Sequence, residues 1–243
     1  MIKVVLFDLG STLIYARNPW KEYYLQGDSA LVNTLENAGY PTAGKPHFNG
    51  NETFMERYYA GLNHSDNVER TSASVLKGML QKMGHREVPM EVIDSALKSL
   101  YESLDQNWFA EEDALPTLAK LKSTGYHLGI ISNTSDDAHV QRLIDRDGFR
   151  PSVDFIITSA GFGIRKPDKS IFQKALDFFN VSPGEAAMVG DTPEADVLGA
   201  NHIGIYSIWI TRRASVTSTT IRPNAMVTSL QEIPELVATI GKT

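Results

Sequence analysis

The sequence predicts an α/β protein, with a Rossmann-like, doubly wound parallel sheet as its core and an inserted α-helical domain. The chain begins with an apolar run, residues 2–7, interrupted only by Lys3, which is typical of a strand buried on both faces of a parallel sheet. From residue 116 onward, helical and strand patterns alternate strictly, which indicates crossover connections between parallel strands. Between these parts, residues 17–105 show helical spacing and no convincing strand. We therefore expect a core domain of residues 1–16 and 106–243, interrupted by a helical domain at 17–105.

The composition is that of a soluble globular protein. A chain of 243 residues with 42% hydrophobic and 21% charged residues can bury a substantial core, in one large or two smaller domains. The net charge of -6 argues against extended contact with nucleic acid or with an anionic membrane surface. The lack of cysteine in the sequence excludes disulfides, thiolate metal sites and cysteine nucleophiles.

No segment of the sequence predicts export or membrane insertion. The apolar run at residues 2–7 is too short for a secretion signal, and no run of about 18 apolar residues occurs elsewhere. We therefore expect a cytoplasmic protein without a membrane partner.

The inserted region is predicted to be helical because its apolar residues recur every three or four positions. In residues 29–38, Leu31, Leu35 and Ala38 fall on one face of a helix. Residues 91–104 form a longer apolar face, made by Val92, Ile93, Leu97, Leu100 and Leu104. Glycine and proline residues separate these segments and predict the loops between helices.

The remaining core elements follow one another as helix and strand pairs. Each predicted helix has apolar residues at helical spacing, and each predicted strand is a short apolar run. The predicted helices are residues 115–123, 138–145, 170–179, 193–201 and 230–240. The predicted strands after the first are residues 126–131, 153–158, 186–189, 205–210 and 225–228. Because right-handed crossovers connect parallel strands, their carboxyl ends are expected at one edge of the sheet.

A carboxylate follows the first predicted strand. Asp8 comes directly after residues 2–7, and ligands of open parallel sheets bind at the carboxyl ends of the strands. Asp8 is therefore a candidate nucleophile or metal ligand. The alternative is structural, because aspartate is also a favoured residue for capping a turn or helix.

Two further strand ends carry groups that suit a phosphate. Ser132 and Asn133 follow residues 126–131, where a hydroxyl, an amide and the start of a helix can bind phosphate oxygens. Lys166 lies in the loop after residues 153–158, and the proline that follows it favours an extended backbone at the lysine. Taken singly, the first pair is better explained as a helix cap and the lysine as a surface residue.

The fourth strand end is acidic. Asp191 follows the strand at residues 186–189, and Asp196 comes five residues later in the first turn of the next predicted helix. Two carboxylates so placed can share one hard cation or its water ligands. The structural alternative is a helix cap followed by an acidic first turn, which the helix dipole favours.

The four strand ends together carry more information than any one of them. A candidate nucleophile, phosphate ligands, a cation and metal-binding carboxylates occur in order along one sheet edge. The four motifs of the haloacid dehalogenase-like hydrolase superfamily resemble segments of this chain, namely Asp8-Leu9-Gly10-Ser11-Thr12, Ile131-Ser132-Asn133, Lys166-Pro167-Asp168, and Gly190-Asp191 with Asp196 after four residues. The resemblance spans almost the whole chain, and the helical insertion resembles the cap domain of some members.

The resemblance implies a metal site and a nucleophile. Asp8 would attack phosphorus to form an aspartyl phosphate, beside Mg²⁺ held by Asp8, the backbone carbonyl of Gly10, and Asp191. Asp196 would support the residues that hold the metal. Carboxylate and water oxygens are the ligands that Mg²⁺ prefers, so the chemistry of the residues agrees with this set.

The resemblance also implies a phosphate-binding set and a class of substrate. Ser132 and Lys166 would bind the transferring phosphoryl group, with Thr12 and Asn133 of the same motifs contributing. Phosphoryl transfer depends mainly on positioning and on neutralising the charge of the equatorial oxygens, which a lysine beside a metal provides. The implied activity is Mg²⁺-dependent phosphatase action on a small phosphorylated metabolite.

One position departs from the family pattern. Most phosphatases of this superfamily have a second aspartate two residues after the nucleophile, as general acid and base, and this chain has Gly10. General acid and base help typically contributes about 10² to 10⁴ in rate, and losing it raises the barrier by roughly 3 to 5 kcal/mol. A substrate with a good leaving group, or a proton donor from the substrate or the cap, would offset that loss.

Gly10 leaves two other functions open. Phosphonate-cleaving members of the superfamily also lack this aspartate, but they need a cap lysine that forms a Schiff base, and no lysine of residues 17–105 carries a local signal for it. A catalytically attenuated member that binds a ligand or regulates a partner is the third alternative. The polar and aromatic residues of the insertion that could touch a substrate, and which helix packing could equally explain, are Arg17, Trp20, Tyr23, Tyr24, Arg57, Tyr58, Tyr59 and His64.

Overall fold

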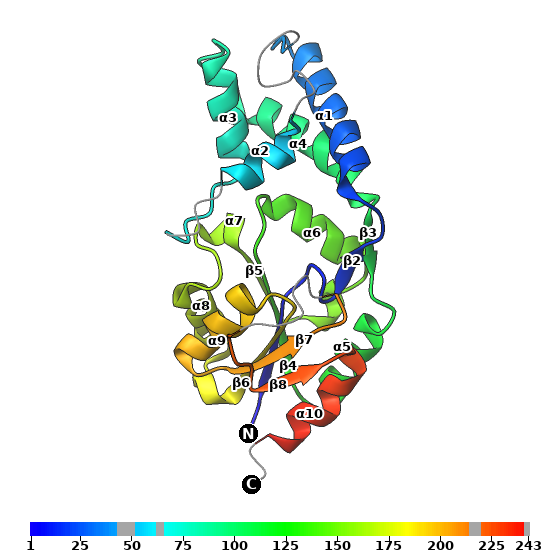
Figure 1. Ribbon diagram of the computed structural model, residues 1–243, viewed down its shortest axis with the longest axis vertical. Coiled ribbons are helices and arrows are strands. Elements are labelled where there is room, and N and C mark those ends of the chain that lie inside the picture. The colour runs from blue at the N-terminus through cyan, green and yellow to red at the C-terminus, as the bar shows by residue number, and fades with distance from the viewer. Residues whose placement is uncertain (43–51, 62–65, 214–219, 241–243) are drawn as a thin grey trace. The chain divides into compact units, whose positions relative to one another are not determined.

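The structure is a computed structural model that describes residues 1–42, 52–61, 66–213 and 220–240. The chain forms two compact units. The first comprises residues 1–15, 67–69 and 109–243 and contains a parallel sheet, whereas the second comprises residues 16–66 and 70–108 and is helical (Figure 1). Among the described residues, no helix is long and apolar enough to cross a membrane.

Within the described residues, the sheet of the first unit has six strands, all parallel, in the order β5-β4-β1-β6-β7-β8. The strands are β1 (Val4–Phe7), β4 (His127–Ser132), β5 (Phe155–Thr158), β6 (Ala186–Gly190), β7 (Tyr206–Ile210) and β8 (Ala225–Val227). This order confirms the predicted doubly wound sheet, since successive crossovers run first to one side of β1 and then to the other. It also places β1 between β4 and β6, so three of the four motif-bearing segments are direct neighbours.

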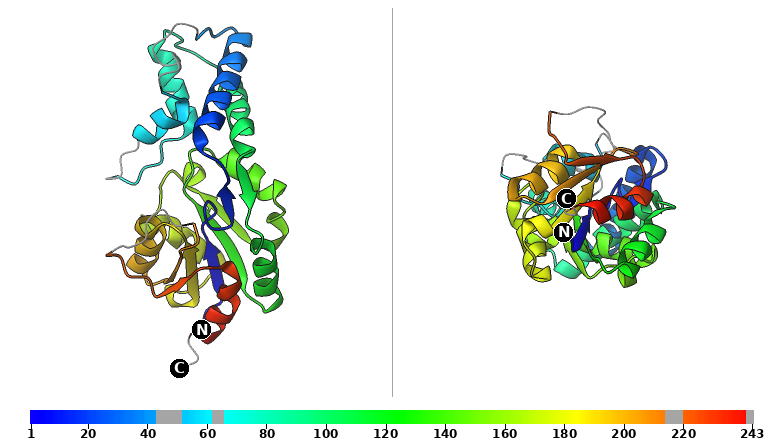
Figure 2. Two further views of the ribbon diagram at one scale, coloured as in Figure 1. Left: turned by 45° about the vertical axis from the view of Figure 1, so that its right-hand side comes forward. Right: turned by 90° about the horizontal axis from the view of Figure 1, so that it is seen from below.

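Helices cover both faces of this sheet. Helices α8 (Lys169–Phe179) and α9 (Leu198–Ile203) lie on one face (Figure 2). Helices α5 (Ala114–Ser123), α6 (Asp137–Arg146) and α10 (Ile233–Thr239) lie on the other (Figure 2). The alternating β and α segments of the sequence predict this three-layer arrangement, which buries the strands on both sides.

The central strands β1 and β6 are apolar and are buried along their whole length. Val4 and Leu6 of β1 are fully buried in a cluster with Ile171 and Phe172 of α8 and Ala200 of α9. Full burial of one such aliphatic or aromatic side chain stabilises the fold by about 1.5–3 kcal/mol. The burial therefore fixes β1 at the centre of the sheet, and with it the position of the residue that follows.

Some elements of the first unit differ from the prediction. The helix expected at 193–201 begins as a π-helical turn, Pro193–Val197, before α9, and the last helix begins as a 3-10 turn, Leu230–Glu232. A short helix α7 (Ser159–Phe162) after β5 was not predicted. Such one-turn segments contain too few residues to show a periodic pattern.

The structure also contains a second sheet, of two strands, that the sequence does not predict. It pairs β2 (Ile14–Ala16) with β3 (Trp108–Ala110), at the two ends of the helical insertion. The Glu111 N–H donates to the Leu13 carbonyl at 2.9 Å and extends this pairing. Three-residue strands carry no alternation that a sequence can reveal, and only their pairing defines them.

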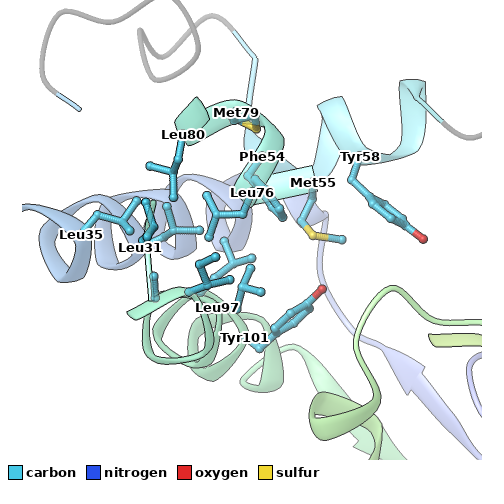
Figure 3. Close-up of a cluster of buried hydrophobic side chains, with 14 of the residues drawn as sticks. Leu31, Leu35, Phe54, Met55, Tyr58, Leu76, Met79, Leu80, Leu97 and Tyr101 are labelled. Atoms are coloured by element: carbon cyan, nitrogen blue, oxygen red, sulfur yellow. The ribbon is translucent and has the colours of Figure 1, made fainter. Parts of the chain in front are cut away.

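The helical unit is built around its own apolar core. Its helices are α1 (Trp20–Asn37), α2 (Phe54–Ala60), α3 (Ser72–Lys82) and α4 (Met90–Asp105). Leu31 and Leu35 of α1 meet Leu97 of α4 and Leu76 of α3 in one buried cluster (Figure 3). The apolar faces predicted at 29–38 and 91–104 are therefore confirmed as core-forming faces, except at Ala38, which follows the end of α1 and is exposed.

Several aromatic residues singled out in this unit serve packing. Trp20 stacks on Tyr24 with ring centroids 5.6 Å apart. Tyr58 is 3% exposed and makes an edge contact with Tyr59 at 5.3 Å. His64 lies outside the described residues.

Close packing between α9 and α8 requires glycine at one position. A side-chain carbon at Gly199 would collide with the Phe172 ring and lie 3.1 Å from Pro167 Cα. We expect Gly199→Ala to destabilise the protein by about 1–3 kcal/mol, because overpacking displaces well-packed side chains. Thermal melting followed by circular dichroism would measure this.

The control for that substitution is Gly184→Ala. A side-chain carbon at Gly184 would have no other atom within 4 Å, so it enters open space. The control should melt like the original protein, and equal melting temperatures for both variants would contradict the packing argument.

Candidate active site

The site is assembled by the register of three adjacent strands. Phe7 at the end of β1 pairs with Ile130 of β4 on one side and with Val189 of β6 on the other. The residues that follow, Asp8 and Asp191, and Ser132 at the end of β4 therefore lie at the same edge of the sheet. All three are buried, with exposed fractions of 8%, 8% and 5%.

Lys166 lies at the centre of this cluster. Its ammonium group donates to Asp8 Oδ1 at 2.7 Å, to Asp196 Oδ1 at 2.6 Å and to the Ile131 carbonyl at 2.7 Å. These three bonds use all three ammonium protons. The lysine predicted from its loop is therefore a buried residue that links the first, second and fourth motif segments.

The charge of Lys166 is maintained by its neighbours. Burial alone would lower the pKa of this lysine, but the carboxylates of Asp196 and Asp8 outweigh burial and raise the pKa above its ordinary value. Lys166 is thus held as a cation whose charge is directed at Asp8. Such a fixed charge in a water-poor site acts more strongly than one in water.

Asn133 holds the backbone of Lys166. Its side-chain oxygen accepts from the Lys166 N–H at 2.8 Å, and its amide nitrogen donates to the Lys166 carbonyl at 3.0 Å. These bonds occupy the oxygen and one of the two amide protons of Asn133. The placement gives Asn133 a clear part in positioning the lysine, and its expected contact with phosphate stays a prediction.

The acidic strand end forms a compact group with Asp8. Carboxylate oxygens of Asp8, Asp191 and Asp196 lie within 4.8 Å of one another. Asp196 uses both oxygens, one with Lys166 and the other with the Thr192 N–H at 3.0 Å. The Asp191 carboxylate accepts from the Thr192 hydroxyl at 3.2 Å.

The carboxylates of this group are buried and repel one another. Burial, followed by repulsion from Asp8 and Asp196, raises the pKa of Asp191 to about 8. Burial also raises the pKa of Asp196, to about 6, although Lys166 opposes the rise. One lysine among three carboxylates leaves an excess of negative charge, which a bound cation would neutralise.

This donor set fits a hard divalent cation. Three buried carboxylates that share one small volume are chemically suited to Mg²⁺, which prefers oxygen ligands and retains several waters. Asp8 and Asp191 are better placed as direct ligands than Asp196. Both oxygens of Asp196 accept close hydrogen bonds, at 2.6 and 3.0 Å, whereas the second oxygen of Asp8 has a contact of 3.5 Å with Thr12.

The glycine before Asp196 permits its approach. A side-chain carbon at Gly190 would collide with the Asp196 carboxyl group, so only glycine leaves room for it there. The absence of a side chain at Gly190 thus lets the Asp196 carboxylate reach Lys166.

The first motif forms a tight turn after β1. The N–H groups of Leu13 and Ile14 both donate to the Leu9 carbonyl, at 2.9 and 3.0 Å, and Ser11 has a positive φ of 58°. Thr12 is buried, and its hydroxyl lies 3.5 Å from Asp8 Oδ2.

Sequence reasoning missed three residues around the lysine loop. Glu69, Ser159 and Arg165 form a buried network in which Glu69 Oε2 accepts from Ser159 Oγ and from Arg165 Nη1, both at 2.6 Å. Arg165 is the immediate neighbour of Lys166, a signal that could have been followed. Glu69 lies in the middle of the insertion, where no local pattern distinguishes it from a solvated glutamate.

Comparison with known proteins identifies relatives of the whole chain. A family model described as haloacid dehalogenase-like hydrolase matches residues 2–204. The chain is 28% identical to a ribulose-1,5-bisphosphate 5-phosphatase from Halopiger xanaduensis, over 98% of this chain and 100% of that one. It is 34% identical to a phosphoserine phosphatase from Thermus thermophilus, but that match covers 48% of this chain and only 46% of the enzyme.

Solved structures share the fold. A 2-haloacid dehalogenase from Pseudomonas syringae superposes with a TM-score of 0.70 at 24% identity, covering 98% of this chain and 99% of that chain. A HAD phosphatase from Thermococcus onnurineus superposes with a TM-score of 0.64, also at 24% identity, with coverages of 97% and 98%. At this level of identity the likeness shows the fold alone.

Burial and the repulsion from neighbouring carboxylates, which raise the pKa of Asp191, predict that stability falls as the pH rises. A raised pKa in the folded state means that the carboxylate costs stability as the pH rises from about 4, its ordinary value, to about 8. We expect Asp191→Asn to raise the melting temperature of the metal-free protein at pH 8 and to reduce the further rise caused by Mg²⁺. Melting curves with chelator and with Mg²⁺ would measure both effects.

Asp145→Asn serves as the comparison for Asp191→Asn. The hydrogen bond from Arg150 lowers the pKa of Asp145, so its substitution should not raise the melting temperature. A lower melting temperature for Asp191→Asn in chelator would show that the three carboxylates do not repel one another as described.

Proposed function

The chain belongs to the haloacid dehalogenase-like hydrolase family, and we propose that it is a Mg²⁺-dependent phosphatase that acts through an aspartyl phosphate on Asp8. The relatives named as phosphatases support a phosphoric monoester hydrolase. The observation that carries the proposal is the contact of the buried Lys166 ammonium with Asp8 at 2.7 Å. It places a positive charge beside a carboxylate at the carboxyl ends of the parallel strands.

The first chemical step is attack of an Asp8 carboxylate oxygen on phosphorus. A bond forms between that oxygen and phosphorus while the bond from phosphorus to the leaving oxygen breaks, and the electron pair leaves with the alcohol oxygen. Lys166 orients the Asp8 carboxylate and neutralises charge on the phosphoryl oxygens. The hydroxyls of Ser132 and Thr12 are the proposed further ligands of the phosphoryl group.

The second step is hydrolysis of the aspartyl phosphate. Water attacks phosphorus, the acyl oxygen leaves as the Asp8 carboxylate, and inorganic phosphate is released. Two easier displacements thus replace one difficult hydrolysis. When bound, Mg²⁺ would supply charge neutralisation at the phosphoryl oxygens, held by Asp8, the Gly10 carbonyl and Asp191, with Asp196 in support.

The leaving group is where this chain differs from most phosphatases of its family. Gly10 supplies a backbone carbonyl but no side chain that could protonate the departing oxygen. The proposed enzyme therefore works best on substrates whose leaving groups are stable anions, or on substrates that carry their own proton donor. The substrate class we propose is a small phosphorylated metabolite.

The helical unit is the proposed cap domain. Its position directly after the first motif corresponds to the place of a helical cap in the family, and a cap would select substrates by what it contacts. A cytoplasmic location forms part of the same proposal, since phosphorylated metabolites are intracellular compounds.

The proposed nucleophile can be tested on p-nitrophenyl phosphate. Asp8→Asn should lower turnover by at least about 10³-fold, because the variant loses the attacking oxygen. Chelation of divalent cations should abolish hydrolysis by the unmodified protein, and added Mg²⁺ should restore it. Asp145→Asn, which removes an exposed ion pair with Arg150, is the control and should retain full activity.

Those experiments can also reject the mechanism. Turnover that survives Asp8→Asn or chelation would exclude an aspartyl phosphate formed beside a metal.

The role of Gly10 can be tested by restoring an aspartate. Gly10→Asp places at this position the side chain that the resemblance to the family implies there. If the proton donor is missing, the variant should gain about 10²-fold in hydrolysis of alkyl phosphates, whose leaving groups need a proton. Hydrolysis of p-nitrophenyl phosphate should change far less, because nitrophenolate leaves without protonation.

The informative quantity is the ratio of the two rates. Equal effects on alkyl and nitrophenyl phosphates, or a loss on both, would indicate that another group already donates the proton in the unmodified enzyme.

A further inference from the structure

We propose that Glu69 is a positioning residue for the phosphate site, which holds the loop of Lys166 and the turn after Ser132 in place. This inference rests on the proposed function, because it assigns Glu69 a part in the same site. Glu69 comes from the insertion between β2 and β3, not from any of the four motifs, and the three residues 67–69 belong to the sheet-containing unit.

The backbone of residues 67–69 runs beside the loop that leads to the lysine. Val68 and Ile164 form an isolated antiparallel bridge. The Arg165 N–H donates to the Asn67 carbonyl at 2.7 Å, and the Glu69 N–H donates to the Gly163 carbonyl at 2.9 Å. The segment therefore pairs with residues 163–165, immediately before Lys166.

The Glu69 carboxylate is fully buried within this arrangement. Its side chain has an exposed fraction of 0%, and Oε2 accepts from Ser159 Oγ and from Arg165 Nη1, each at 2.6 Å. Burying a carboxylate is costly unless it is paired and hydrogen-bonded. An apolar residue could fill this space at a lower cost in free energy. We infer that the Glu69 carboxylate serves to hold Ser159 and Arg165 in a defined geometry.

Two short paths lead from this carboxylate to the lysine. Through Arg165 the path is covalent, because Lys166 is the next residue. The second path runs through Ser159, whose Oγ accepts from the Thr134 N–H at 2.8 Å. Thr134 is preceded by Asn133, whose side chain makes both hydrogen bonds to the Lys166 backbone.

Both paths therefore hold the backbone of Lys166 in place. The Lys166 ammonium must stay within hydrogen-bonding distance of Asp8 and Asp196, and the turn that begins at Ser132 must face the same phosphoryl group. A displacement of about 1 Å in a positioning group can cost about 10²-fold in rate. Glu69 acts through Ser159 and Arg165, and this makes it a positioning residue.

The experiment compares Glu69 variants with a matched buried carboxylate. Asp113 is the match, since its carboxylate also binds an arginine, Arg212, at 2.9 Å and a serine hydroxyl, that of Ser229, at 2.8 Å. Its partners lie after β7 and before α10, away from the Lys166 loop in sequence. Glu69→Ala and Asp113→Ala thus remove the same kind of interaction from the same unit.

Two measurements on the full chain separate positioning from general stabilisation. The first is calorimetric binding of inorganic phosphate in the presence of Mg²⁺, together with kcat and KM for p-nitrophenyl phosphate. The second is hydrogen exchange of the backbone amides in residues 133–136 and 163–168. Melting temperatures are recorded for every variant, so that a loss of stability is known separately.

The expected pattern is specific to Glu69. Glu69→Ala should weaken phosphate binding and lower kcat/KM by about 10- to 100-fold, with faster exchange in both segments, whereas Asp113→Ala lowers only the melting temperature. Glu69→Gln keeps an oxygen acceptor and nearly the same volume, so it should fold and recover part of the binding. Ser159→Ala should reproduce the faster exchange at residues 133–136 alone.

The opposite pattern would overturn the inference. If Glu69→Gln and Glu69→Ala bind phosphate as the unmodified protein does, with unchanged exchange in both segments, Glu69 contributes only stability. Failure of the proposed function looks different. In that case, either the unmodified protein does not bind phosphate, or its binding persists in Lys166→Met. The exchange data still decide in that case whether Glu69 holds the two segments.

Discussion

The structure depends on one buried contact, in which the Lys166 ammonium is shared by Asp8, Asp196 and the Ile131 carbonyl. A buried ammonium is unfavourable without compensation, so the carboxylates must stay close to it and must stay charged. Burial, together with repulsion from Asp8 and Asp196, raises the pKa of Asp191. Three carboxylates beside one lysine leave an excess of negative charge that suits a cation. The site therefore carries more negative than positive charge, and a bound metal ion would neutralise that excess and the charge of a phosphoryl group.

The fold makes this contact possible by placing three strand ends side by side. A doubly wound sheet with β1 between β4 and β6 brings together segments that are more than a hundred residues apart in the chain. Small residues then allow the close approach, as at Gly190, where a side chain would displace the Asp196 carboxyl group. Stability of the sheet and geometry of the site thus have a common origin in the buried apolar strands.

The sequence was sufficient for the fold class and for bringing the four motifs to one edge, because long apolar runs and strict alternation are strong signals. It was insufficient for β2, β3 and α7, which are too short to show a period. It also could not show that both ends of the Asn133 side chain are engaged with the Lys166 backbone, since spacing reveals proximity but not orientation. Glu69 was missed for a further reason: a single glutamate becomes informative only when its burial and partners are known.

The central claim is that Asp8 forms a phosphoryl adduct in a site completed by Lys166 and a metal. Beryllium fluoride mimics a phosphoryl group on an aspartate, so the most direct measurement is the melting temperature with Mg²⁺ and beryllium fluoride together. The account predicts a clear rise that requires both additives and is lost in Asp8→Asn. No rise in the unmodified protein, or a rise that persists in Asp8→Asn, would contradict it.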